Sequence, residues 1–99
     1  MKDLFQHINK VFENRVRLAL LSILMVNDAV DFNSLKQTLN VTDGNLSTHM
    51  ATLEKHRYVT VRKKFKGRKP LTTYSATPEG RRAFREHLNA LERLIKEVQ

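Results

Sequence analysis

The sequence of 99 residues contains no cysteine, which excludes disulfides and thiolate metal sites and fits a reducing cytoplasm. No apolar run approaches the roughly 20 residues that a membrane-spanning helix requires. The opening Met1-Lys2-Asp3 does not resemble the start of a signal peptide, and we expect none. Acidic residues are absent between Lys55 and Pro78, so all the charged side chains of that segment are positive. We therefore expect a cytoplasmic protein that folds as one domain over residues 1–99.

The segment from residue 55 to 78 carries eight Lys or Arg, and this excess equals the formal net charge of +8 of the whole chain. Because the segment lacks the helical amphipathicity of an interfacial anchor, nucleic acid is a more suitable partner than a membrane. Apolar residues at alternate positions from Val59 to Phe65, interrupted at Lys63, predict a strand. A second strand is predicted over residues 71–76, after a turn at residues 66–70 that contains Gly and Pro.

Helical patterns precede this basic hairpin. Residues 4–26 are helix-like, with apolar side chains on two stripes. Two stripes are typical of a helix that is covered on both sides, either by its own core and a second subunit or within a single core. Val30-Asp31-Phe32 is expected to be a very short strand, and Asn33 to cap a short helix over residues 34–39.

A second short helix is expected to begin at Asp43, with Thr42 as its N-cap. Its buried row occupies positions i, i+4 and i+7, which are Leu46, Met50 and Leu53. Its other face is small and polar, as it must be if the helix is to enter a major groove about 12 Å wide. The two helices predict a helix-turn-helix over about residues 33–56.

The polar face of this second helix supplies the first candidate contacts to DNA. Asn45 is expected to bond an adenine edge, and Ser47 and Thr48 to bond phosphates or bases. His49 flanks the buried row, so it either contacts DNA or packs against the hairpin. A solvated helix face is the alternative for these four residues, whereas Thr42 is expected to cap the helix first and to contact DNA second. The candidates are Thr42, Gly44, Asn45, Ser47, Thr48 and His49.

The basic hairpin supplies the second set of candidates. Its Lys and Arg side chains are expected to contact phosphates, and Arg68 at the tip is best placed for a minor groove. The alternative is a hairpin that its charge merely keeps soluble, although a solvated face normally contains acids as well. The candidates are Arg62, Lys64, Lys66, Gly67, Arg68 and Lys69.

A last helix is predicted to begin at Thr77-Pro78-Glu79, which reads as an N-cap, a Pro at the first helical position and an acid in the first turn. The helix is expected to reach about Val98. Its apolar residues are spaced as in a coiled coil, and we favour dimerisation over packing within one subunit. The candidates for this contact are Phe84, Leu88, Leu91, Leu94, Ile95 and Val98.

The order of these motifs resembles that of the winged-helix transcriptional regulators, the small MarR/ArsR-like proteins of bacteria and archaea. The matching runs are Asp43-Gly44-Asn45-Leu46-Ser47-Thr48-His49-Met50, Leu53-Glu54, Tyr58-Val59 and Thr77-Pro78-Glu79-Gly80. The resemblance covers about residues 14–94. It implies a mainly α fold with a two- or three-stranded β wing at about residues 58–77, and a C-terminal dimerisation helix at about residues 78–98. It also implies a homodimeric regulator that binds double-stranded DNA sequence-specifically. One departure is Arg57, which stands where such proteins usually place Gly.

Other functional classes receive little support from the sequence. The four histidines, His7, His49, His56 and His87, lack metal-ligand spacing, so we expect no metal and no cofactor. No Gly-rich phosphate loop or nucleophile–base motif is visible, and we do not expect an enzyme. The alternative function is a winged-helix protein-interaction subunit of a transcription or replication complex. Because no separate ligand domain is visible, any small-molecule effector would sit at the dimer interface.

Overall fold

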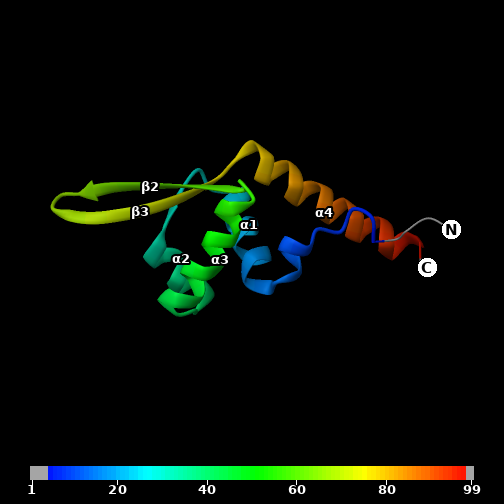
Figure 1. Ribbon diagram of the computed structural model, residues 1–99, viewed down its shortest axis with the longest axis horizontal. Helices are drawn as coiled ribbons and strands as arrows, with labels where there is room; N and C mark the ends of the chain where they lie inside the picture. The colour runs from blue at the N-terminus through cyan, green and yellow to red at the C-terminus, as the bar shows by residue number, and fades with distance from the viewer. Residues whose placement is uncertain (1–4, 98–99) are drawn as a thin grey trace.

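The computed structural model describes residues 5–97, which form several helices and one small sheet (Figure 1). The elements in order are η1 (Lys10–Glu13, a 3-10 helix), α1 (Arg15–Met25), β1 (Val30–Asp31), α2 (Phe32–Leu39), α3 (Asp43–Lys55), β2 (Val59–Lys66), β3 (Lys69–Ala76) and α4 (Pro78–Glu97). The sheet is antiparallel and has the strand order β1-β3-β2. This architecture confirms the mainly α winged-helix fold with a three-stranded sheet.

The first helical segment is shorter than its apolar pattern predicts, because two asparagines interrupt it. The side chain of Asn14 accepts hydrogen bonds from the backbone N–H groups of Val16 (2.9 Å) and Arg17 (3.1 Å), so α1 begins only at Arg15. Asn9 caps η1 in the same way. Asn side chains compete with the helical ladder for backbone N–H groups, which is why they are preferred at caps. Leu4, where the predicted helix began, lies outside the described residues.

The start of α2 also differs from the prediction. Asp31, not Asn33, is the N-cap, and its carboxylate accepts from the backbone N–H (3.1 Å) and the hydroxyl (2.6 Å) of Ser34. These hydrogen bonds lower the pKa of Asp31, since they favour the charged form. Helix α2 therefore begins at Phe32, and the predicted strand at residues 30–32 is limited to Val30–Asp31.

Helix α3 follows the prediction closely. The Thr42 hydroxyl accepts from the backbone N–H of Asn45 at 3.1 Å, and the predicted apolar row faces the core. After its last turn, Arg57 has a φ of 62°, in the left-handed region that Gly normally occupies at this position. A non-Gly residue there costs about 1–2 kcal/mol. Several hydrogen bonds hold the turn. The Arg57 carbonyl accepts from the Thr77 hydroxyl (2.6 Å), and the N–H groups of Arg57 and Tyr58 donate to the carbonyls of Glu54 and Leu53 (both 2.9 Å).

Strands β2 and β3 form a hairpin, called the wing below, that projects past the helices on one side of the molecule (Figure 1). The strands pair without interruption from Val59↔Ala76 to Lys66↔Lys69. Only Gly67 and Arg68 form the turn, so the predicted five-residue turn is wrong. Gly67 has a φ of 65°, as the first central residue of a two-residue hairpin loop requires. The tight turn makes the wing longer than the sequence indicated.

The core lies where α1, α3 and the base of the wing meet the first half of α4. Its fully buried members include Leu20, Leu24, Leu46 and Leu53. Phe12 of η1 closes this core, because its ring stacks on Tyr58 (5.5 Å between centroids) and meets Phe84 edge-on (5.2 Å). The end of α3, the first residues of the wing and α4 are therefore held in one packing unit, which sets the direction in which the wing projects.

Helix α4 extends away from the wing (Figure 1), and its first turn is tied to α1. The Thr77 hydroxyl accepts from the Gly80 N–H at 2.8 Å, as the predicted cap requires. The guanidinium of Arg81 donates to the last carbonyls of α1, those of Leu24 (3.2 Å) and Met25 (3.0 Å). A helix leaves its last carbonyls without internal partners, so a cation here satisfies them and complements the helix dipole.

Burial of His87 in α4 leads to a prediction about pH. Its Nδ1 accepts from the Asn9 backbone N–H (3.0 Å), and burial lowers the pKa of His87 below its ordinary 6.5, against a smaller opposing effect of Glu13. Because the unfolded chain binds the proton more readily, the free energy of unfolding should fall as pH drops below about 6.5. We expect thermal melts between pH 7 and pH 5 to show a smaller decrease for His87→Asn than for the natural protein. An equal decrease in His87→Asn and in the natural protein would contradict the prediction.

Candidate functional site

The outer face of α3 carries small polar side chains that nothing in the described protein covers. Gly44, Asn45, Ser47 and Thr48 are all exposed, whereas the apolar row of the same helix is buried. The Asn45 side chain makes no hydrogen bond to any group within residues 5–97. The Thr48 hydroxyl donates to the Gly44 carbonyl (2.9 Å), so its oxygen remains able to accept. This face therefore presents free amide and hydroxyl groups to solvent.

His49 has a partner that the sequence did not indicate. Arg17 of α1 places Nη1 2.9 Å from the His49 Nδ1 atom, while its Nε donates to the Val11 carbonyl at 2.7 Å. A guanidinium can only donate, so Nδ1 accepts and the ring proton is on Nε2. Burial and, to a smaller extent, the charge of Arg17 lower the pKa of His49. The ring is thus held neutral, with Arg17 rather than the wing as its partner.

The beginning of α3 is anchored to α2 by an ion pair. Lys36 Nζ lies 2.8 Å from the Asp43 carboxylate, which occupies the first turn of α3. A carboxylate is favourable there because of the helix dipole. The exposed Thr42 hydroxyl is already used as the cap. Next to Asn45 and His49 lies an open hollow of about 370 Å³ that Arg15 also lines.

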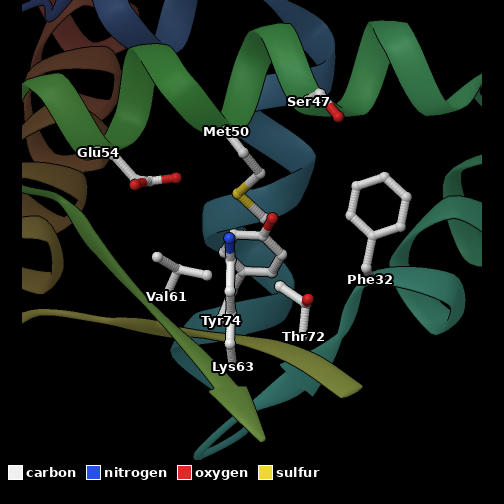
Figure 2. Close-up of a pocket in the computed structure, with 8 residues that line it drawn as sticks. All are labelled: Phe32, Ser47, Met50, Glu54, Val61, Lys63, Thr72 and Tyr74. Carbon is white, nitrogen blue, oxygen red and sulfur yellow. The ribbon is translucent and has the colours of Figure 1, made fainter. Parts of the chain in front are cut away.

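The two faces of the wing differ, because side chains alternate along a strand. Arg62, Lys64 and Lys66 lie on one face, away from α3. Lys63 lies on the other face and lines an open groove of about 460 Å³ between the wing and α3. Figure 2 shows Lys63 and Tyr74 directed from the wing toward α3, with Glu54 reaching down from the helix.

The outer part of the wing has an unusual concentration of charge. All residues from Arg62 to Pro70 are exposed, and they include six cations and no carboxylate. Within the described part of the chain, none of these six forms an ion pair. Their mutual repulsion is not compensated inside the protein, so a polyanion is the partner that would stabilise this arrangement. The members are Arg62, Lys63, Lys64, Lys66, Arg68 and Lys69.

The predicted dimerisation residues lie on two sides of α4. Phe84 is buried in the core of its own chain. Leu91 and Leu94 are half-buried, whereas Leu88 and Ile95 are exposed by 44% and 58%. Val98 lies outside the described residues. The candidate residues of α4 that are exposed or half-buried therefore all follow Phe84 in the sequence.

Two further observations bear on the kind of site. Nowhere among residues 5–97 do three or more His, Asp or Glu side chains gather closely enough to hold a metal ion. In the same part of the chain, no helix has the length and apolarity needed to cross a membrane. The groups that stand out are the polar face of α3 and the cations of the wing.

Comparison with known proteins gives consistent results. Residues 16–95 match the family model described as the winged helix DNA-binding domain. The chain is 33% identical over 90 residues to an uncharacterised protein of Methanocaldococcus jannaschii, a match that spans 91% of this chain and 98% of that protein. Its fold is similar to that of a transcriptional regulator homologue from Pyrococcus horikoshii OT3, with a TM-score of 0.86, 25% identity, and coverage of 97% of this chain and 93% of the other. A MarR-family protein from Porphyromonas gingivalis W83 has the same fold, with a TM-score of 0.64, 17% identity, and coverage of 88% and 80%.

Proposed function

Since the chain belongs to the winged helix DNA-binding domain family and is a DNA-binding transcriptional regulator, we propose that it acts as a homodimer that recognises a specific duplex sequence. The observation that carries this proposal is the pairing of two surfaces. The free polar face of α3 lies beside a wing whose six cations have no carboxylate partner within residues 5–97. One surface is suited to base edges, and the other is suited to phosphates.

Helix α3 would enter the major groove with its polar face toward the bases. An α-helix with its side chains is about 10–12 Å across, close to the width of the groove. The small residues Gly44 and Ser47 keep the helix narrow on this side. The free amide of Asn45 can donate to and accept from an adenine edge at once. The Nε2–H of His49 is a donor, so it would bond a phosphate or a guanine acceptor.

The wing would bind the sugar-phosphate backbone beside the major groove. Arg62, Lys64, Lys66 and Lys69 are exposed along its strands and would pair with phosphates. Arg68 and Gly67 form the turn, and the absence of a side chain at Gly67 would allow a close approach to the duplex. Arg68 would reach the minor groove, where its guanidinium meets a strongly negative potential.

Two copies would associate through the exposed side of α4. Leu88, Leu91, Leu94 and Ile95 supply apolar surface there, and a domain of this size gains stability by burying it. A two-fold dimer carries two copies of α3 related by symmetry. Its binding site should therefore be a pseudo-palindrome with half-sites separated by one or more helical turns, at about 34–36 Å per turn.

The experiment that tests this function is a titration of the protein against its own upstream DNA and a scrambled duplex, at several salt concentrations. Light scattering on the same samples gives the mass of the free protein and of the complex. Tighter binding of the upstream DNA, a steep salt slope and a dimeric mass are the expected results. A protein that binds no duplex, but binds a protein partner independently of salt, would instead be an interaction subunit.

Replacement of Asn45 by alanine tests the recognition face. We expect Asn45→Ala to weaken binding of the preferred duplex by about 5- to 150-fold, because a bidentate contact contributes about 1–3 kcal/mol of discrimination. Binding of a duplex altered at the contacted base pair should change little. Asn89→Ala, at an exposed position on α4, is the matched control and should bind like the natural protein. An unchanged sequence preference in Asn45→Ala would show that another face of α3 reads the DNA.

A further inference from the structure

The outer end of the wing carries an aromatic side chain with no cover. Phe65 is 73% exposed, and Pro70 lies directly opposite it on β3 and is also exposed. Full burial of a Phe side chain is worth about 1.5–3 kcal/mol relative to leaving it in water. A hairpin tip that only had to remain soluble would place a polar residue here. The exposed pair therefore indicates a partner for this end of the wing.

Phe65 lies on the side of the wing that α3 faces. Along β2, the residues of this parity go from buried Val59 through Val61 and Lys63 to Phe65. Val61 and Lys63 line the groove against α3, and Figure 2 shows Lys63 pointing toward that helix. Phe65 is the next residue outward on the same face. A duplex that rests against the outer side of α3 would meet this face of the wing, and the long Lys and Arg side chains of the other face would reach its phosphates past the edges of the strands.

The surroundings of Phe65 indicate the chemistry of the partner. Its strand neighbours are Lys64 and Lys66, and Pro70 is preceded by Lys69 and Arg68. The apolar pair is thus enclosed by cations. The minor groove of DNA has a matching pattern, because its floor and sugar walls offer apolar surface between two lines of phosphates. With a width of about 6 Å, it admits an aromatic ring edge but no helix.

We propose that Phe65, supported by Pro70, inserts into the minor groove as an apolar wedge that opens a base step and bends the bound duplex. Phe and Pro side chains are among those that unstack base steps in this way, with bends of about 20–90°. The pyrrolidine ring of Pro70 fixes the φ angle of that residue, and the two-residue turn keeps both strands paired to the tip. The wedge is therefore preformed. This inference rests on the proposed function, since it requires a duplex bound to α3 and the wing.

The absence of tryptophan from the chain allows a direct test. Phe65→Trp introduces a single indole at the wedge. Leu71→Trp is the matched control, because Leu71 is one pair further in and lies opposite Lys64, on the other face of the wing. With upstream DNA, we expect the indole emission of the Phe65→Trp variant to be strongly quenched by the stacked base and protected from acrylamide. The emission of the Leu71→Trp variant should change little. Equal responses of the two probes would overturn the proposal.

A second measurement separates the wedge from DNA binding in general. Fluorescence energy transfer between dyes at the two duplex ends reports the bend. We expect Phe65→Ser to reduce the bend and to lower affinity about tenfold, while the salt slope stays the same because no cation is removed. If the natural protein binds duplex with a steep salt slope but the bend and the affinity do not depend on Phe65, the proposed insertion of Phe65 is wrong and the proposed function stands. If the natural protein binds no duplex, both are wrong.

Discussion

Replacement of Arg62, Lys64, Lys66 and Arg68 by glutamine is expected to weaken duplex binding on the order of a thousandfold near 0.1 M salt. Each phosphate contact releases counterions and contributes about 0.9 to the slope of log K against log salt concentration. Four lost contacts should therefore flatten the slope by about 3.6. The fold should be retained, because these side chains are exposed and none forms an ion pair within the described residues. Titrations at four or more salt concentrations give both quantities.

The control removes the same charge from another surface. Arg82, Arg85, Arg93 and Lys96 are exposed on α4, and their replacement by glutamine lowers the net charge equally. We expect a much smaller loss of affinity and an almost unchanged slope, provided that light scattering gives an unchanged mass. Equal losses in the two variants would mean that net charge attracts the duplex, without a specific role for the wing. A difference between them assigns the phosphate contacts to the wing.

Substitution of Gly80 by alanine is expected to destabilise the fold by about 3–5 kcal/mol. A Cβ atom built on Gly80 would meet the backbone of Tyr58, 2.8 Å from both its carbonyl carbon and its Cα, and would overlap its carbonyl oxygen. That oxygen already accepts from the Thr77 N–H at 3.0 Å. Backbone cannot move aside as a side chain does, so α4 would be displaced from the base of the wing. For a domain of this size, the melting temperature should fall by about 12–40 °C.

Gly44 provides the matched control, since it also lies in a helix. A Cβ atom there would meet nothing within 4 Å, and alanine favours a helix over glycine by about 1 kcal/mol. Gly44→Ala should therefore melt at the same temperature as the natural protein or slightly higher. Calorimetry or circular dichroism on both variants decides the matter. A Gly80→Ala protein as stable as the Gly44→Ala protein would contradict the close approach of α4 to Tyr58.

Features set by neighbours within one helical turn could be predicted from the sequence. Thr42 and Thr77 cap α3 and α4 through backbone N–H groups three residues further on, and the apolar row of α3 has helical spacing. The winged-helix resemblance, built on the order of such motifs, is confirmed by the family match over residues 16–95. The cap of α2 was predicted wrongly, because Asp31 and Asn33 are both good caps. In the structure Asp31 is the cap, and it also pairs with Thr73 of β3, which lies 42 positions later in the chain.

Periodicity, caps and composition act over short stretches of chain, and they were enough to predict the helix-turn-helix, the wing and the region of positive charge. Long-range packing settled which groups these elements bring together. It joined Arg17 to His49 across 32 positions, buried Phe84 while leaving Leu88 exposed, and turned Lys63 and Phe65 toward the side of α3. The partners and the exposure of a side chain depend on segments that lie far away in the chain. Local patterns contain no information about which distant segment packs against a given residue.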